Sequence, residues 1–85
     1  MKNKEVFKER KQKLDTLIAE AGYKSFRAFS KDVDITAANL YSNLDTTYDI
    51  SIKRMFKIAQ VLNVPILQII DVFYPDELAE NQSLF

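Results

Sequence analysis

The segment from Ser25 to Leu44, SFRAFSKDVDITAANLYSNL, constrains the fold more than any other part of this 85-residue chain. Ser25 and Thr36 each precede a helical pattern, and each hydroxyl can accept a hydrogen bond from a backbone N–H left unpaired in the first helical turn. Apolar residues recur at helical spacing after both caps. The segment therefore predicts short helices at 26–32 and 37–44. They are joined by a tight turn around Asp34, because Asp tolerates the left-handed backbone conformation better than most residues.

The rest of the chain also reads as helical, since it holds one Gly and two Pro. Apolar residues on one stripe predict a first helix over 4–21, which Gly22 ends. Ser51 is the expected cap of a fourth helix that runs to about residue 62, and Pro65 suits the first position of a fifth helix over 65–73. The apolar face expected of the fourth helix consists of Ile52, Met55, Phe56, Ala59 and Leu62. The prediction is an all-α domain of five helices.

Length and composition limit the number of domains to one. A chain of 85 residues that is 47% hydrophobic is globular and builds a single small core. We expect one domain over residues 1–85, with the core at about 10–73 and flexible ends at 1–5 and 76–85. No apolar run approaches the roughly 20 residues of a membrane span. The expectation is a cytoplasmic protein without a membrane partner.

The residue types that are missing exclude most enzyme chemistry. The chain has no cysteine and no histidine, so it offers no thiol nucleophile, no imidazole base and no zinc site of the Cys/His kind. Asp32 and Asp34 form an i,i+2 pair near a turn, and capping or turn roles explain both. We expect no enzymatic activity, no metal and no cofactor.

Charge is divided unevenly along the chain although the formal net charge is zero. Residues 1–31 hold nine Lys or Arg against four Asp or Glu, whereas residues 32–85 hold three against eight. No basic residue follows Lys57. A phosphate backbone would therefore approach the N-terminal half and avoid the C-terminal end.

The order of these features resembles the lambda-repressor-like family of helix-turn-helix proteins, the Cro and xenobiotic-response-element group of phage and bacterial regulators. Gly22 matches the family's first helix end, Phe29-Ser30 stands for its Leu-Ala, and Asp34-Ile35-Thr36 stands for its Gly-Val-Ser turn. The segment IAQVLNVP, residues 58–65, is similar to the family's later pattern. The chain departs from the family at Phe26, where Gln is common, and at Leu44 and Thr46, where an acidic residue and Gly are usual.

The resemblance implies a transcriptional regulator of the phage or bacterial repressor type, with the third helix in the major groove of operator DNA. The outer face of that helix supplies the expected base contacts, which are Ala37, Ala38, Asn39, Ser42 and Asn43. That helix has no Lys or Arg, so the phosphate contacts must come from residues around it. These are Lys24, Ser25, Arg27, Thr46, Thr47, Tyr48, Lys53 and Arg54.

The fifth helix is apolar nearly all round, which is more than one small domain can cover. We therefore expect a homodimer, with Ile66, Ile69, Ile70 and Phe73 at its interface. An alternative function is a protein-interaction module of the same fold, such as an antirepressor or modulator that binds another regulator. The uncharged third helix and the acidic C-terminal half favour this alternative.

Overall fold

The ends of the helices are set by local sequence. Gly22, Asp34 and Asn63 have left-handed backbone conformations, with φ of 91°, 57° and 56°. After each of them, the next backbone N–H bonds a carbonyl five residues back, as Val64 does to Ala59 at 3.0 Å. This is the Schellman arrangement, which satisfies carbonyls that the last helical turn leaves unpaired.

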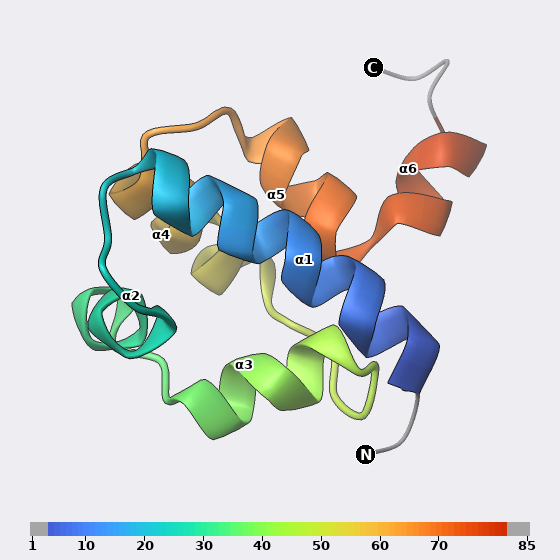
Figure 1. Ribbon diagram of the computed structural model, residues 1–85. Coiled ribbons are helices and arrows are strands. Elements are labelled where there is room, and N and C mark those ends of the chain that lie inside the picture. The colour runs from blue at the N-terminus through green and yellow to red at the C-terminus, as the bar shows by residue number, and fades with distance from the viewer. Residues whose placement is uncertain (1–3, 82–85) are drawn as a thin grey trace.

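The computed structural model describes residues 4–81, and this part of the chain is all-α (Figure 1). Its six helices are α1 (Lys4–Glu20), α2 (Phe26–Val33), α3 (Ala37–Leu44), α4 (Ile52–Leu62), α5 (Ile66–Phe73) and α6 (Pro75–Glu80). None of these helices is long and apolar enough to cross a membrane.

The helices enclose one apolar core. α1 packs against α2, α3 and α5, while α4 packs against α2 and α5. Each of the first five helices contributes side chains, and the turn before α3 and the loop before α4 add one each. The buried apolar residues are Leu14, Ile18, Phe29, Val33, Ile35, Leu40, Leu44, Ile50, Met55, Ile58, Ala59, Leu62, Ile69, Val72 and Phe73.

One buried cation ties the first helix to the fifth. Arg10 of α1 is only 8% exposed, and its Nη1 donates a hydrogen bond of 2.7 Å to the carbonyl of Phe73. That carbonyl belongs to the last residue of α5, where the helix dipole favours a positive charge. The guanidinium therefore caps α5 from a residue far away in the sequence.

The described residues form six helices and not the expected five. The sixth helix follows Tyr74, where a flexible tail from residue 76 was expected. Pro75 occupies the first turn of α6, and Asp76 and Glu77 lie in that turn as well. Proline at the first position and acidic residues near the positive end both favour a helix start. The first helix begins at Lys4, as predicted. Residues 1–3 and 82–85 lie outside the described residues.

Two expectations about apolar faces were wrong. Ile52 and Phe56, expected on the apolar face of the fourth helix, are 56% and 55% exposed, because α2 and α5 cover only the part of that face that carries Met55, Ala59 and Leu62. Conversely, Ile69 and Phe73, expected at a dimer interface, are 0% and 1% exposed within the chain's own core. The apolar surface available to a partner therefore lies on α4 more than on α5.

Candidate nucleic-acid interface

Helices α2 and α3 form a rigid pair because both starts and the turn between them are satisfied by hydrogen bonds. The Ser25 hydroxyl accepts from the N–H of Ala28, and the Thr36 hydroxyl accepts from that of Asn39, each at 3.1 Å. In the turn, the buried Ser30 hydroxyl donates to the carbonyl of Ile35. The predicted caps and the predicted turn are confirmed.

The outer face of α3 is small and uncharged. Ala38 and Asn39 are exposed, while Ala37 and Ser42 are half-buried. The opposite face anchors the helix through Leu40 and Leu44, which are completely buried. Four of the five predicted base-contact residues therefore reach the surface, on a helix narrow enough to enter a groove about 12 Å wide.

The prediction that the fifth residue, Asn43, contacts a base was wrong. It is only 7% exposed, and its Nδ2 donates to the carbonyl of Tyr48 at 3.1 Å. Asn43 faces inward because it comes three residues after the buried Leu40, on the same side of the helix. It organises the loop after α3 and does not present its side chain to a base.

The loop after α3 leaves the side chain of Tyr48 exposed to solvent. Asp45 Oδ1 accepts hydrogen bonds from the backbone N–H of Thr47 at 2.9 Å and from its hydroxyl at 2.6 Å. Thr46 has a φ of 68°, which is rare for a β-branched residue. The Tyr48 side chain is 69% exposed. The two hydrogen bonds to Asp45 fix the conformation of the loop. Thr47 and Tyr48 are exposed in it, and Thr46 is half-buried.

The predicted phosphate-contact cations are exposed and unpaired. Within residues 4–81, the ion pairs join Lys11 to Asp15 at 2.9 Å and Lys13 to Asp71 at 3.3 Å. Neither pair uses the cations of α2 or α4. Exposed cations of this kind keep their full charge available to an anion. They are Lys24, Arg27, Lys53 and Arg54.

Sequence reasoning missed one further cation, Lys31. Together with Ser25, Arg27 and Thr36, it lines an open groove of about 650 Å³ beside the turn. Its place four residues after Arg27 was the available signal, since i and i+4 share a helix face. Asp34 lines the same groove and opposes an anion there.

Phe26 joins the helices by packing. Its ring lies 5.2 Å from that of Tyr41, measured between centroids. Tyr41 in turn meets the ring of Phe7 edge-on at 5.5 Å. Lys11 Nζ lies 5.1 Å from the centroid of the Phe26 ring, a cation–π geometry. These aromatic contacts therefore hold α3 against α1 and α2.

A second contact stiffens the start of the pair. The Tyr23 hydroxyl donates to Asp32 Oδ2 at 2.7 Å, and this hydrogen bond is the largest cause of the raised pKa of Tyr23. The bond engages the carboxylate of Asp32 in a side-chain contact, which differs from the cap or turn role expected of it. Asp32 and Asp34 do not combine with other His, Cys, Asp or Glu residues of the described chain into a metal-binding group.

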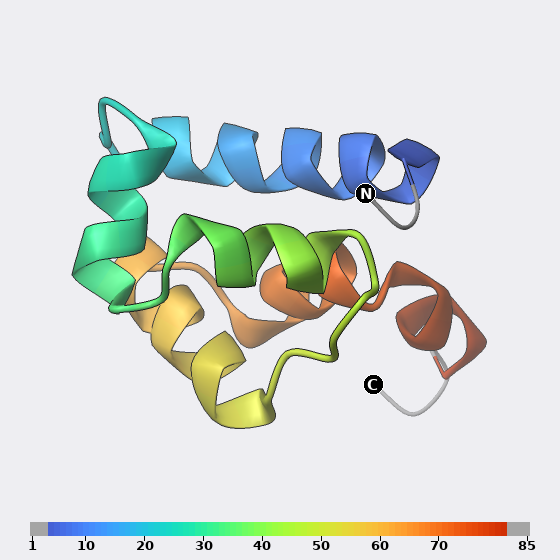
Figure 2. The same cartoon turned by 90° about the horizontal axis from the view of Figure 1, so that it is seen from below.

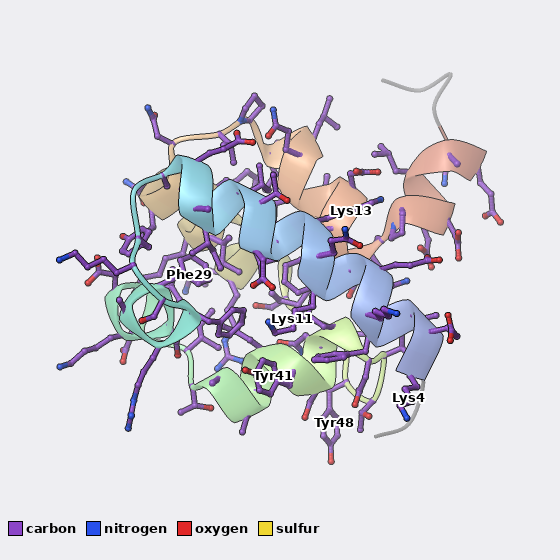
Figure 3. The ribbon with its side chains drawn as sticks, in the orientation of Figure 1. Lys4, Lys11, Lys13, Phe29, Tyr41 and Tyr48 are labelled. Carbon is purple, nitrogen blue, oxygen red and sulfur yellow. The ribbon has the colours of Figure 1, made fainter. Side chains whose placement is uncertain are left out.

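The arrangement places cations on both sides of α3. In Figure 2, α3 lies between the N-terminal end of α2 and the N-terminal end of α4. Arg27 belongs to the first of these ends and Lys24 comes two residues before it, whereas Lys53 and Arg54 belong to the second. Figure 3 shows Tyr48 projecting on the α3 side of the molecule, whereas Lys13 lies on the far side of α1. A neutral helix flanked by positive charge suits a duplex, whose phosphates border the groove on both sides.

Comparisons of the chain with protein-family models, with curated proteins and with solved structures found no match.

Proposed function

We propose that this protein is a sequence-specific DNA-binding regulator of the lambda-repressor-like helix-turn-helix type, with α3 in the major groove. The observation that carries the proposal is the exposed, uncharged face of α3 between two groups of unpaired cations. Asn39 pairs best with adenine, and the methyl groups of Ala37 and Ala38 suit thymine. The cations bind phosphates, which fixes orientation without reading sequence.

The uncharged α3 also predicts how affinity depends on salt. Each phosphate neutralised by Lys or Arg contributes about −0.9 to the slope of log affinity against log salt concentration. The four predicted cations together give a slope no steeper than about −4. A single domain therefore binds DNA weakly at physiological salt. A dimer removes this weakness, because two linked domains occupy two half-sites.

The dimer contact in this proposal lies on α4 and the start of α5. Phe56, Pro65 and Ile66 line one shallow groove, and Ile52 lies one turn before Phe56 on α4. The domain measures 35 × 29 × 21 Å. Two copies in contact have centres 21 to 35 Å apart, according to which axis crosses the contact. The upper end of this range reaches the ~34–36 Å between successive half-sites on one DNA face.

The test is selection of bound sequences from random duplex DNA at low salt. We expect one enriched motif with two half-sites. Asn39→Ala should weaken binding to it by about 1–3 kcal/mol and relax the preference at one base pair, whereas Arg27→Ala should weaken all sequences and reduce the salt slope by about 1. Lys13→Ala is the matched control, because it removes one charge on the side of α1 that faces α5. No enrichment would overturn the proposal.

A second function, a module that binds another protein, is favoured by the exposed apolar residues. Tyr48, Ile52 and Phe56 are each more than half exposed and follow one another along the loop and α4. If this function holds, Phe56→Glu abolishes partner binding while Asn39→Ala and Arg27→Ala leave it unchanged. DNA retention that depends on Asn39 decides in favour of the first function.

A further inference from the structure

One side of α4 combines exposed apolar side chains with positive charge. Ile52 and Phe56 are 56% and 55% exposed, and the neighbouring Lys53 and Lys57 are exposed as well. Each of these two pairs is spaced four residues apart, so the four side chains lie on one side of the helix, which we call the α4 face. Arg54 adds a third cation, and α4 contains no acidic residue. The α4 face is therefore an apolar strip bordered by cations alone.

Helix α6 has the opposite charge. Asp76, Glu77 and Glu80 are exposed, and α6 contains no basic residue. The helix packs on α5, yet none of its six residues is buried. Asp76 and Glu80 have the same spacing of four residues as the lysines of the α4 face, and the exposed Ala79 lies beside them. Helix α6 therefore presents a small apolar side chain bordered by carboxylates.

Among residues 4–81, no charge of α4 or α6 has an ion-pair partner. The ion pairs in this range join Lys11 to Asp15 and Lys13 to Asp71, which are residues of α1 and α5. In both views of the ribbon, α6 lies at one end of the molecule, apart from α4 (Figures 1 and 2). Contact between these two helices therefore requires two copies of the chain.

Charge decides which surface of a second copy fits the α4 face. A contact between two α4 helices brings the cations of both copies together, and like charges juxtaposed at an interface oppose association. A contact between α4 and α6 brings cations to carboxylates instead. The spacing of the charges is the same on both helices, and the small Ala79 leaves room for the ring of Phe56. The surface of the chain that complements the α4 face is therefore α6.

We propose that the α4 face binds α6 of a second copy of this chain, and that the contact is reciprocal, so that two copies close into a dimer. The lysines of the α4 face pair with the carboxylates of Asp76 and Glu80 in the second copy, and Phe56 lies against Ala79 of that copy. A reciprocal contact satisfies both helices of both copies. A one-way contact leaves one α4 and one α6 free and continues as an open chain.

This pairing rests on the proposed function, because it supplies the surface opposite α4 in the proposed dimer. Lys53, at the start of α4, is also a predicted phosphate contact, so its charge serves both surfaces. Lys57 lies one turn further on and serves the dimer contact alone. Both helices are short and their charges are exposed, so the contact is at the small end of the range for protein interfaces. Salt screens its attraction.

The test is sedimentation of the full chain without DNA, from about 10 μM to about 1 mM, a range suited to a weak interface. We expect a monomer–dimer equilibrium with a micromolar dissociation constant at low salt, which weakens as the ionic strength rises. The double variants Lys53→Glu, Lys57→Glu and Asp76→Lys, Glu80→Lys should each weaken the dimer about tenfold or more, since each replaces attraction by repulsion at both contacts. An equimolar mixture of these two variants should form dimers again, because every α4 then meets an α6 of opposite charge.

Two further variants serve as controls. Glu9→Lys, Glu20→Lys makes the same change of charge at exposed positions of α1, and it should leave the dimer unchanged. Lysine at the start of α6 opposes the helix dipole and can unfold that helix. The neutral variant Asp76→Asn, Glu80→Gln avoids this effect, and it should also weaken the dimer.

Three outcomes would overturn the proposal. The wild-type chain stays monomeric up to about 1 mM at low salt, where an interface of even small size is populated. Either α6 variant associates as wild type does, which indicates a contact between two α4 helices. The mixture of the two charge-reversed variants stays monomeric although both keep their helical circular dichroism. A monomeric chain that still enriches a single half-site separates failure of this contact from failure of DNA binding, and failure to enrich any DNA motif leaves the contact untouched.

Discussion

Replacing Thr46 by glycine should stabilise the protein. Thr46 has a φ of 68° in the loop after α3, and a side chain with a branched Cβ is strained in that conformation. An L-residue in the left-handed region costs about 1–2 kcal/mol, which glycine does not. Glycine in turn gives the unfolded chain more freedom, which offsets about 0.4–1 kcal/mol. The net gain in the free energy of unfolding is about 0.5–1 kcal/mol.

The assay is thermal and urea unfolding of wild type, Thr46→Gly and Thr46→Ala, followed by circular dichroism. For a domain of this size, the gain corresponds to a rise in Tm of about 2–8 °C. Alanine keeps a Cβ in the left-handed conformation, so Thr46→Ala should gain less than Thr46→Gly. The reasoning from backbone strain is refuted if the two variants are equally stable or if Thr46→Gly is less stable than wild type.

Two other predictions concern the hydroxyl of Tyr74 and the apolar surfaces. The pKa of Tyr74 is raised above 10.0, first by burial, so the stability from its protonated hydroxyl is complete below pH 10 and is lost as the pH rises through the folded-state value. Denaturant midpoints from about pH 9 to pH 11 should therefore fall more for wild type than for Tyr74→Phe, and parallel curves would contradict this. Ile69→Asp places an unpaired charge in the core and should cost about 4 kcal/mol or more, whereas Phe56→Glu should keep the helical circular dichroism and yield a monomer in sedimentation. A folded Ile69→Asp chain, or an unchanged mass for Phe56→Glu, would contradict the assignment of the two surfaces.

The helix starts could be predicted from sequence because their causes are local. Ser25, Thr36 and Ser51 each accept the expected hydrogen bond from the N–H three residues on, at 3.1, 3.1 and 3.2 Å. The left-handed Asp34 was foreseeable for the same reason, since only its own backbone conformation matters. Residue type and a window of a few residues contain this information.

Which side of a helix is covered could not be predicted in the same way. Met55 and Phe56 are adjacent apolar residues on α4, yet the first is buried and the second exposed. The periodicity of α4 gives one broad apolar stripe, and only the positions of α2 and α5 decide which part of it is covered. Asn43 was misassigned for a similar reason, because its partner carbonyl at Tyr48 lies in a loop whose path periodicity does not describe.

The sixth helix was not predicted, because a proline can either follow the end of one helix or begin another. Tyr74-Pro75 ends α5, as expected, but Pro75 also begins α6. A side-chain bond at the far end, from Asn81 Nδ2 to the Glu77 carbonyl at 2.8 Å, gives the short helix a defined stop. The acidic residues Asp76 and Glu77 in its first turn are the sequence feature that favours this helix start.

The bond from Arg10 to the Phe73 carbonyl has a consequence for synthesis of the chain. The two residues are separated by 63 positions, and α1 also packs directly on α5. When a ribosome has released residues 1–44, α2 and α3 are complete, but α1 has no α5 to cover it. At about 5–20 residues per second, the remaining 29 residues up to Phe73 take a few seconds. Helices α1, α2 and α3 are therefore all translated before α1 can gain its contacts with α5.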